Sequence, residues 1–310
     1  MRFVQIPAAL VAVVCLTVTA VAQDQSSTRA FVDQISLRTD DDNALARWDQ
    51  RVCVGAVGLA PAEAQALVDR ISARAQAVGL RTGEPGCRAN VMVIYAPDSD
   101  AISRQIVDQR RDLLGFQGDD GRITAGREAM EDFANTPRPI RWWHISTSGV
   151  GSIRPDAARA RRPSGTTAAM AASGGGSGGA SGVGAGDVGS PLDIQGAEGV
   201  RTSGTRTRAE VRNDLSYALV VVDARRVANV PAGAWMDYVA LVTLAQLDPD
   251  SQTANYPTIL NLFNASATPP TGLTNWDVAY LQGLYNARSD ASGRQLASIA
   301  RRMDGSVGQN

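Results

Sequence analysis

A strand, a helix and a second strand follow one another between residues 51 and 96, and this succession constrains the fold more than any other feature. Residues 51–59 (RVCVGAVGL) are β-prone, and residues 90–96 (NVMVIYA) form a continuous apolar run of strand length. Between them, residues 61–78 place apolar side chains on one helical face and charged ones on the other, before Gly79. This close succession predicts parallel strands in a sheet covered by helices.

Later segments extend the same α/β pattern. Apolar residues at helical spacing predict a helix over residues 100–114, and a shorter one follows Thr124. Residues 140–146 (IRWWHIS) and 217–224 (YALVVVDA) are predicted strands, and residues 235–247 form an apolar, buried helix. The sequence therefore predicts a mixed sheet covered by helices, with a helical C-terminal part.

The composition changes abruptly at residues 149–213. The stretch SGGGSGGASGVGAGDVGS lies between two arginine-bearing flanks and carries too little apolar surface to offset its ordering entropy. We expect a disordered insertion here, whose arginines are solvated or touch an anionic surface. Ser177 matches a hydrolase elbow and residues 184–189 match GxGxxG, but neither match is joined to the strand and helix that such sites need.

The N-terminus has the layout of a secretory signal peptide, with Arg2, an apolar run over residues 4–21 and a small-residue site ending at Ala22. A membrane anchor and lipoprotein processing at Cys15 are the alternatives. We expect a periplasmic or secreted chain without a membrane span after cleavage. The expected divisions are a signal peptide (1–22), a flexible segment (23–45), an α/β domain in two parts (46–148 and 214–303) around the disordered insertion (149–213), and a tail (304–310).

Export changes the interpretation of the cysteines. The mature chain keeps Cys53 and Cys87, which fall near the same end of the two predicted parallel strands. We expect a disulfide between them, with two separate buried thiols as the alternative. Two cysteines without clustered histidines supply too few ligands for zinc.

The charge and the aromatic residues limit the partners. A net charge of -1 indicates no nucleic-acid partner, and 44% hydrophobic residues suffice for a core. The lone histidine, His144, follows Trp142 and Trp143. We interpret this trio as structural, with stacking on a sugar or peptide as the alternative.

The C-terminal third resembles the metzincin clan of secreted zinc peptidases, especially its matrixin-like and serralysin-like members. In that clan a sheet strand leads into a helix bearing HExxHxxGxxH, then into a turn reading S-[IV]-M-N, and a final helix often begins L-[ST]-x-x-D. Here the strand 217–224 precedes the helix 235–247, the turn TILN at 258–261 and the segment LTNWDVAYLQGLY at 273–285. The resemblance implies a zincin-like α+β scaffold. Thr274 and Asp277 also form a helix-capping pattern by themselves.

The zinc-binding chemistry of that clan is missing from this sequence. On the motif, Val239 and Thr243 occupy the first two ligand positions, Ala240 the general-base position and Pro249 the third ligand position. A catalytic zinc needs about three protein ligands and a base. We therefore expect no cofactor, no metal and no catalytic residue, and a non-catalytic module that binds a protein, a peptide or an envelope component.

A secreted hydrolase with an unrecognised carboxylate site is the alternative function. The carboxylates nearest the implied cleft are Asp223, Asp237 and Asp248. That function requires at least two of them to converge in one pocket, whereas binding requires a groove and an available strand edge.

Overall fold

Six stretches of the chain are described by the computed structural model. They are residues 27–37, 45–116, 125–150, 211–265, 268–287 and 292–307. The expected signal peptide and most of the expected insertion lie outside them. Within the described residues, no helix is long and apolar enough to cross a membrane.

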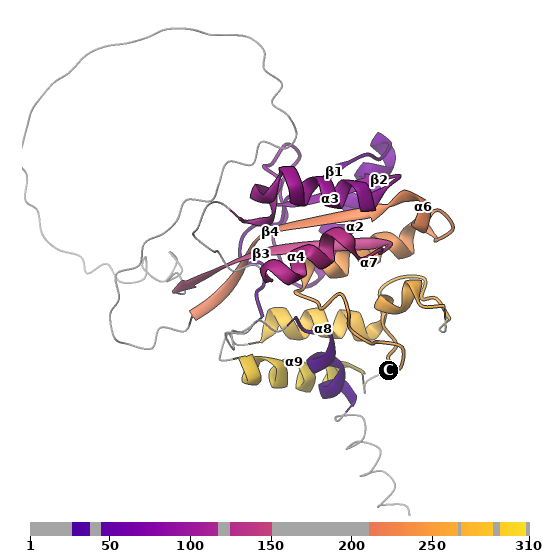
Figure 1. Cartoon of the computed structure of the whole chain (residues 1–310). Coiled ribbons are helices and arrows are strands. Elements are labelled where there is room, and N and C mark those ends of the chain that lie inside the picture. Colours follow the sequence, from indigo (N-terminus) through magenta and orange to yellow (C-terminus); the bar gives the residue numbers. More distant parts are fainter. Residues whose placement is uncertain are drawn as a thin grey trace, which may run out of the picture. The chain divides into compact units, whose positions relative to one another are not determined.

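A four-stranded mixed sheet forms the centre of the fold, in the order β1-β2-β4-β3 (Figure 1). Its strands are β1 (Val54–Val57), β2 (Val91–Ala96), β3 (Ile140–Val150) and β4 (Val211–Asp223). β1, β2 and β4 are parallel, and β3 pairs antiparallel with β4 at the edge. The predicted mixed α/β fold and the parallel pairing of the first two strands are therefore confirmed.

Helices cover both faces of the sheet. α2 (Pro61–Ala77) and α7 (Ala232–Leu244) pack together on one face, and α3 (Ser99–Gln109), η1 (Arg111–Leu114) and α4 (Gly126–Asn135) lie on the other. α2 begins with Pro61 and is followed by Gly79 at φ 84°, a backbone angle that favours glycine, as predicted. Coverage on both faces explains why β2 and residues 217–222 of β4 are apolar.

The C-terminal part of the chain adds further helices to those that cover the sheet. After α6 (Ala224–Val227) and α7, the chain forms η2 (Ile259–Phe263), α8 (Asn275–Asn286) and α9 (Ser292–Val307). The predicted capping box of α8 is present, with the Thr274 side chain and the Asp277 side chain each bonding the other's backbone. α9 continues to residue 307, so it runs into residues expected to be a tail.

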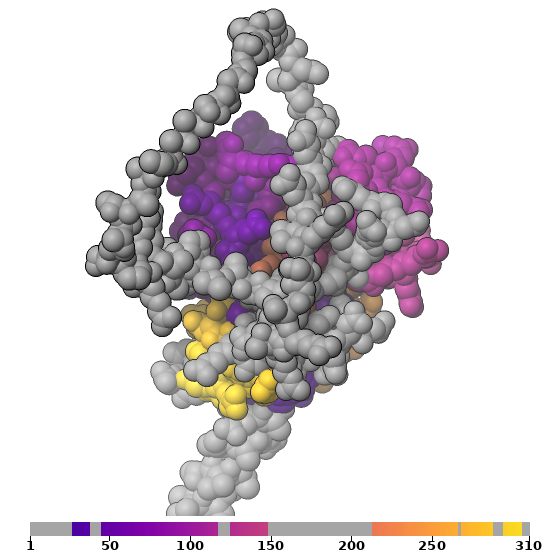
Figure 2. Space-filling view, turned by 90° about the vertical axis from the view of Figure 1, so that its left-hand side faces the viewer, coloured from indigo at the N-terminus to yellow at the C-terminus, as the bar shows by residue number. Residues whose placement is uncertain are grey.

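The N-terminal segment differs from the flexible one expected over residues 23–45. Residues 27–35 are helical, and Phe31, Val32 and Ile35 are buried in the core. The helix lies beside α9 in Figures 1 and 2, where Thr28 donates a hydrogen bond to Asp304. The Phe31 ring also packs edge-on against Trp276 of α8, at 5.2 Å between ring centroids. Aromatic packing with distant elements orders this segment.

The cysteines and the insertion boundaries can also be placed. Cys53 and Cys87 form a disulfide, as predicted from their positions around the crossover. β3 extends to Val150 and β4 begins at Val211, and these two residues are register partners. The pairing of β3 and β4 therefore extends into the first and last residues of the expected insertion (149–213), because backbone pairing continues beyond the apolar part of each strand.

Candidate functional site

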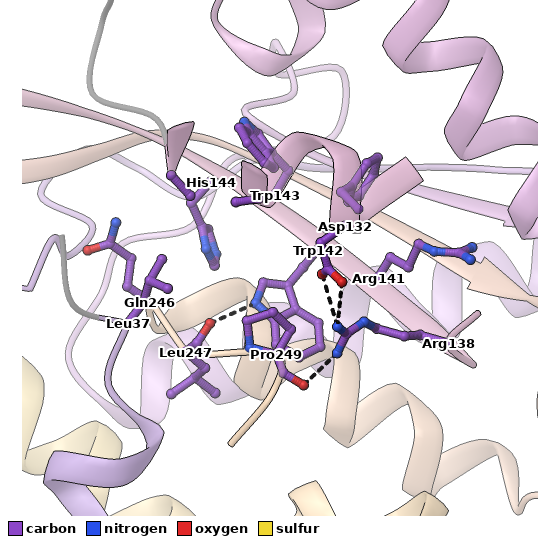
Figure 3. Close-up of a pocket in the computed structure, with 13 residues that line it drawn as sticks. Leu37, Asp132, Arg138, Arg141, Trp142, Trp143, His144, Gln246, Leu247 and Pro249 are labelled. Atoms are coloured by element: carbon purple, nitrogen blue, oxygen red, sulfur yellow. Dashed lines mark hydrogen bonds and ion pairs between the residues drawn. The ribbon is translucent and has the colours of Figure 1, made fainter. Parts of the chain in front are cut away.

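A pocket lies along the outer edge of β3. Its walls come from four parts of the chain, namely α4, β3, residues 246–249 after α7, and Leu37 (Figure 3). The cavity measures about 60 Å³. Its lining includes all three residues of the trio expected from the sequence, Trp142, Trp143 and His144.

The two indole rings are walls of this pocket and do not form an exposed stacking surface. Trp142 is 9% exposed and Trp143 is 3% exposed. Each Nε1 donates to a backbone carbonyl, Trp142 to Leu247 at 3.1 Å and Trp143 to Leu114 at 3.0 Å. Alternate residues of a strand face opposite sides of a sheet, so Trp142 packs toward α7 and Trp143 toward α4. The pair therefore fixes both sides of the strand edge.

His144 is the polar group at the centre of the pocket wall. Its side chain lies on the α7 side of β3, is 7% exposed, and points toward the segment that carries Gln246 and Leu247 (Figure 3). Burial lowers the pKa of His144 to about 4, and the backbone carbonyls of Val242 and Thr243 oppose that shift. The imidazole is therefore neutral at neutral pH. Its Nε2 is buried and has no hydrogen-bond partner among the described residues.

An arginine closes one end of the pocket. Arg138 donates to the carbonyl of Pro249 at 2.6 Å and forms ion pairs with Asp132 at 2.9 Å and Asp250 at 2.8 Å. Burial alone would lower the pKa of Arg138, but Asp250 and Asp132 raise it, so the guanidinium stays charged. This arginine holds the start of β3, α4 and the segment after α7 together.

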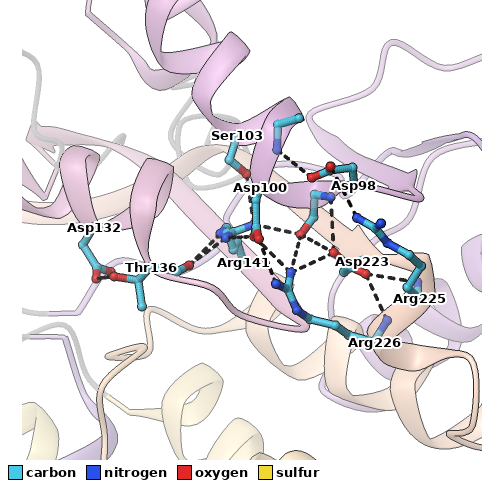
Figure 4. A network of polar contacts seen from close by, with 11 residues as sticks. Asp98, Asp100, Ser103, Asp132, Thr136, Arg141, Asp223, Arg225 and Arg226 are labelled. Atoms are coloured by element: carbon cyan, nitrogen blue, oxygen red, sulfur yellow. Dashed lines mark hydrogen bonds and ion pairs between the residues drawn. The ribbon is translucent and has the colours of Figure 1, made fainter.

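A second polar cluster lies at the α3 end of the sheet, and its positive and negative side chains pair with one another (Figure 4). Arg141, 1% exposed at its side chain, pairs with Asp100 and donates to Ser99 Oγ at 2.8 Å. Arg226 pairs with Asp100 and Asp223, both at 2.8 Å. These arginines lower the pKa of Asp100, and the cluster leaves no uncompensated charge for a ligand.

The three carboxylates of the hydrolase alternative do not converge. Asp223 caps α6 and accepts from Ser99, whereas Asp237 accepts from Arg70 and Arg74 of α2. Asp248 accepts from the backbone N–H of Asp250 at 2.9 Å. None of the three lines the pocket. Each carboxylate therefore serves a local structural role.

The residues at the peptidase-motif positions are distributed between core and pocket. Val239, Ala240 and Thr243 are fully buried in α7, while Pro249 lines the pocket. No group of three or more histidine, cysteine or acidic residues is close enough to hold a metal ion in the part of the chain described. A zinc site of the peptidase type cannot be built from these side chains.

Sequence reasoning missed the residues that complete the pocket. Asp132 and Arg138 come from a segment that carries no motif, and Gln246 and Leu247 lie within the stretch aligned with the peptidase motif but not at its ligand or base positions. Gln246 is also structural, because its Oε1 accepts from the backbone N–H of Ala46 at 2.7 Å. Comparisons with protein-family models, with curated proteins and with solved structures found no match.

Proposed function

We propose that this chain is an exported, non-catalytic binding protein that holds an extended peptide against the outer edge of β3. The observation that carries the proposal is an edge strand of 11 residues with a pocket beside it. Exposed strand edges bind extended peptides through main-chain hydrogen bonds, and adjacent pockets select their side chains.

The register of the sheet identifies the backbone groups that face outward. The backbone N–H of Asp223 donates to the carbonyl of Pro139 at 2.9 Å, so hydrogen-bonded pairs occur at every second residue from that position. Ile140, Trp142 and His144 fall between them, and their N–H and C=O groups point away from β4. No backbone hydrogen bond joins these three residues to another described segment. They are the donors and acceptors that a peptide strand would use. Because Ile140, Trp142 and His144 are only 2%, 9% and 7% exposed, a peptide would reach these groups after the side chains that cover the edge move aside.

The order of elements supports a scaffold of the metzincin type. β4, α7, η2 and the capped helix α8 follow one another as the resemblance implies. The face of α7 that would carry zinc ligands is filled by Val239 and Thr243, which are packed in the core. We propose that the cleft of such a scaffold has kept its strand edge and lost its metal chemistry.

Export is part of the same proposal. The Cys53–Cys87 disulfide is compatible with a periplasmic or extracellular location, where oxidising conditions preserve such bonds. The expected partner is a protein, a peptide or an envelope component. The alternative function, a secreted hydrolase, lacks support because Asp223, Asp237 and Asp248 bond to separate structural partners.

The decisive experiment modifies the peptide and leaves the protein intact. Residues 23–310 would be used to select binders from displayed random 12-residue peptides, and one enriched peptide would be synthesised with N-methyl groups on alternate amides. Because only every second amide of an added strand faces β3, one alternating set should weaken binding by about tenfold or more. The other set should leave the affinity nearly unchanged.

Two results would contradict strand addition. If no peptide is enriched, the edge of β3 is not a peptide site, and if both N-methylated sets bind equally, the peptide does not pair as a strand. Light scattering during gel filtration provides a further check. A stable dimer that excludes the selected peptide would show that a second copy of the chain occupies this edge.

A further inference from the structure

The side chains that line the pocket restrict which chemical groups can enter it. Leu37, Ala129, Phe133 and Leu247 supply apolar walls. The charged side chains that line it are already neutralised, since Arg138 pairs with Asp132 and Arg141 pairs with Asp100. An entering group meets no net charge, so a cation or an anion would lose its hydration without compensation.

Among the described residues that line the pocket, His144 carries a buried hydrogen-bonding atom without a partner. A neutral imidazole carries one N–H donor and one acceptor nitrogen. The carbonyls of Val242 and Thr243 interact with the ring and favour the N–H on that side. Nε2, which has no partner among the described residues, is then an acceptor. A buried unsatisfied acceptor is costly, and a ligand that donates a hydrogen bond removes that cost.

The volume of the cavity limits which hydrogen-bond donors of a ligand can fit into it. A cavity of about 150 Å³ holds a benzene molecule, whereas this pocket measures about 60 Å³. An aromatic ring or a long amide side chain does not fit that volume. A short side chain that combines a few carbon atoms with one hydroxyl group matches both the volume and the apolar walls.

A peptide strand paired with β3 would place one of its side chains at the pocket. Residues opposite each other on adjacent strands project their side chains to the same face of the sheet. A peptide residue opposite Trp142 or His144 therefore points toward the α7 side, where Gln246 and Leu247 line the pocket. Its neighbours in the peptide point toward α4 on the other side.

We propose that this pocket is a specificity subsite that accepts a serine or threonine side chain of the bound peptide, with its hydroxyl group donating a hydrogen bond to Nε2 of His144. The inference rests on the proposed function, because it requires a peptide strand on β3. It names the side-chain class that the site selects, which the strand edge alone does not determine.

The test compares threonine with valine, which have nearly the same shape and differ in one hydroxyl group. In a selected peptide, each position would be replaced in turn by threonine, valine, serine or phenylalanine, and the affinity for residues 23–310 measured. At one position threonine should bind about tenfold tighter than valine, and phenylalanine should bind more weakly than either. Equal affinities of threonine and valine at every position would overturn the subsite while leaving strand addition intact.

Two protein variants assign the preference to His144. His144→Phe removes the acceptor and should reduce the threonine-to-valine ratio from about ten to about one, with valine peptides still bound. His144→Gln keeps an acceptor oxygen and should retain part of the preference. An unchanged ratio in His144→Phe would overturn the inference. If this variant does not fold, the threonine and valine comparison on the unmodified chain still decides whether a hydroxyl group is selected.

Discussion

Single buried side chains determine much of the behaviour of this protein at the residue scale. Arg141 and Asp237 are nearly inaccessible charges that are satisfied by several partners, whereas His144 is a buried imidazole with an unpartnered Nε2 among the described residues. Satisfied buried charges join elements to one another, whereas a buried polar atom without a hydrogen-bond partner lowers stability. In the proposed binding function, His144 is therefore the residue at which binding would offset a loss of stability.

His144 should make stability depend on pH above the range in which most carboxylates titrate. Burial lowers its pKa from 6.5 to about 4, so between these values the unfolded chain binds a proton that the folded chain does not. The contribution of His144 to the free energy of unfolding should be at its maximum above about pH 6.5. It should fall by about 3 kcal/mol as the pH drops to about 4. Urea denaturation between pH 4.5 and 7.5 would measure this loss.

The matched control for this pH dependence is His144→Gln, which cannot bind a proton. Burial also raises the pKa of Asp277, whose effect on stability runs in the opposite direction, but this group is present in both proteins. Asp132, Arg138 and Arg141, which line the same pocket, are likewise unchanged. The difference between the two proteins therefore isolates His144, and identical pH profiles would show that the imidazole is solvated.

At the scale of elements, α7 is the central structural support. All of its residues from Ala234 to Leu244 are buried, so the helix packs on every side and not on one face alone. Asp237 joins it to Arg74 of α2 at 2.9 Å, and Trp48 donates to the carbonyl of Thr243 near its end at 2.9 Å. Substitutions in this helix should therefore act on the whole core.

Val239→Asp tests whether this helix face is filled core or an open metal-binding face. Val239 is fully buried, and an aspartate there would place an unpaired charge among apolar side chains. The free energy of unfolding should fall by several kcal/mol, at roughly 3 to 5 kcal/mol. Ala66→Asp on the exposed side of α2 is the control and should cost less than about 1 kcal/mol. Equal losses in the two variants would mean that Val239 lies at an accessible surface.

Local signals explain which elements could be predicted from the sequence. The limits of α2 follow from Pro61 and Gly79, and the start of α8 from Thr274 and Asp277, because each signal lies within a few residues of the boundary that it sets. α9 was missed, although Leu296, Ile299, Ala300 and Met303 are buried at helical spacing.

Elements that depend on distant contacts could not be predicted. Residues 27–35 form a helix too short to be stable alone, and its Phe31 packs on Tyr256 and Trp276, more than 200 residues later. The pocket is similar, since Arg138 and Pro249 meet only because β3 pairs with β4 and α7 follows β4. Neither the register nor this proximity is encoded in a short motif.

At the scale of the whole molecule, the described residues before Val150 and after Val211 belong to one compact unit. β3 and β4 remain paired up to Val150 and Val211. The described residues before and after the segment between these two residues therefore belong to one domain, and the segment is an insertion in the sequence of that domain instead of a boundary between two domains.

Replacing residues 164–199 with a short glycine-serine linker should leave thermal stability nearly unchanged. The closure entropy of a loop depends only weakly on its length, and both ends of this loop stay joined by the ladder of β3 and β4. We expect a shift in Tm of less than about 4 °C, which corresponds to about 1 kcal/mol for a domain of this size. Differential scanning calorimetry would measure it. Two separate transitions, or a larger fall in Tm, would contradict the single-domain organisation.

The strand order has a consequence for the way in which the chain is made. β4 is the last strand in the sequence but lies between β2 and β3, so β3 has no neighbour in the sheet until residue 223 has been synthesised. The helix at residues 27–35 must wait longer, because its partners α8 and α9 are the last elements of the chain. Folding dominated by such distant contacts is slow. A nascent chain with this topology therefore gains the partners of β3 and of the helix at residues 27–35 only when its C-terminal part has been synthesised.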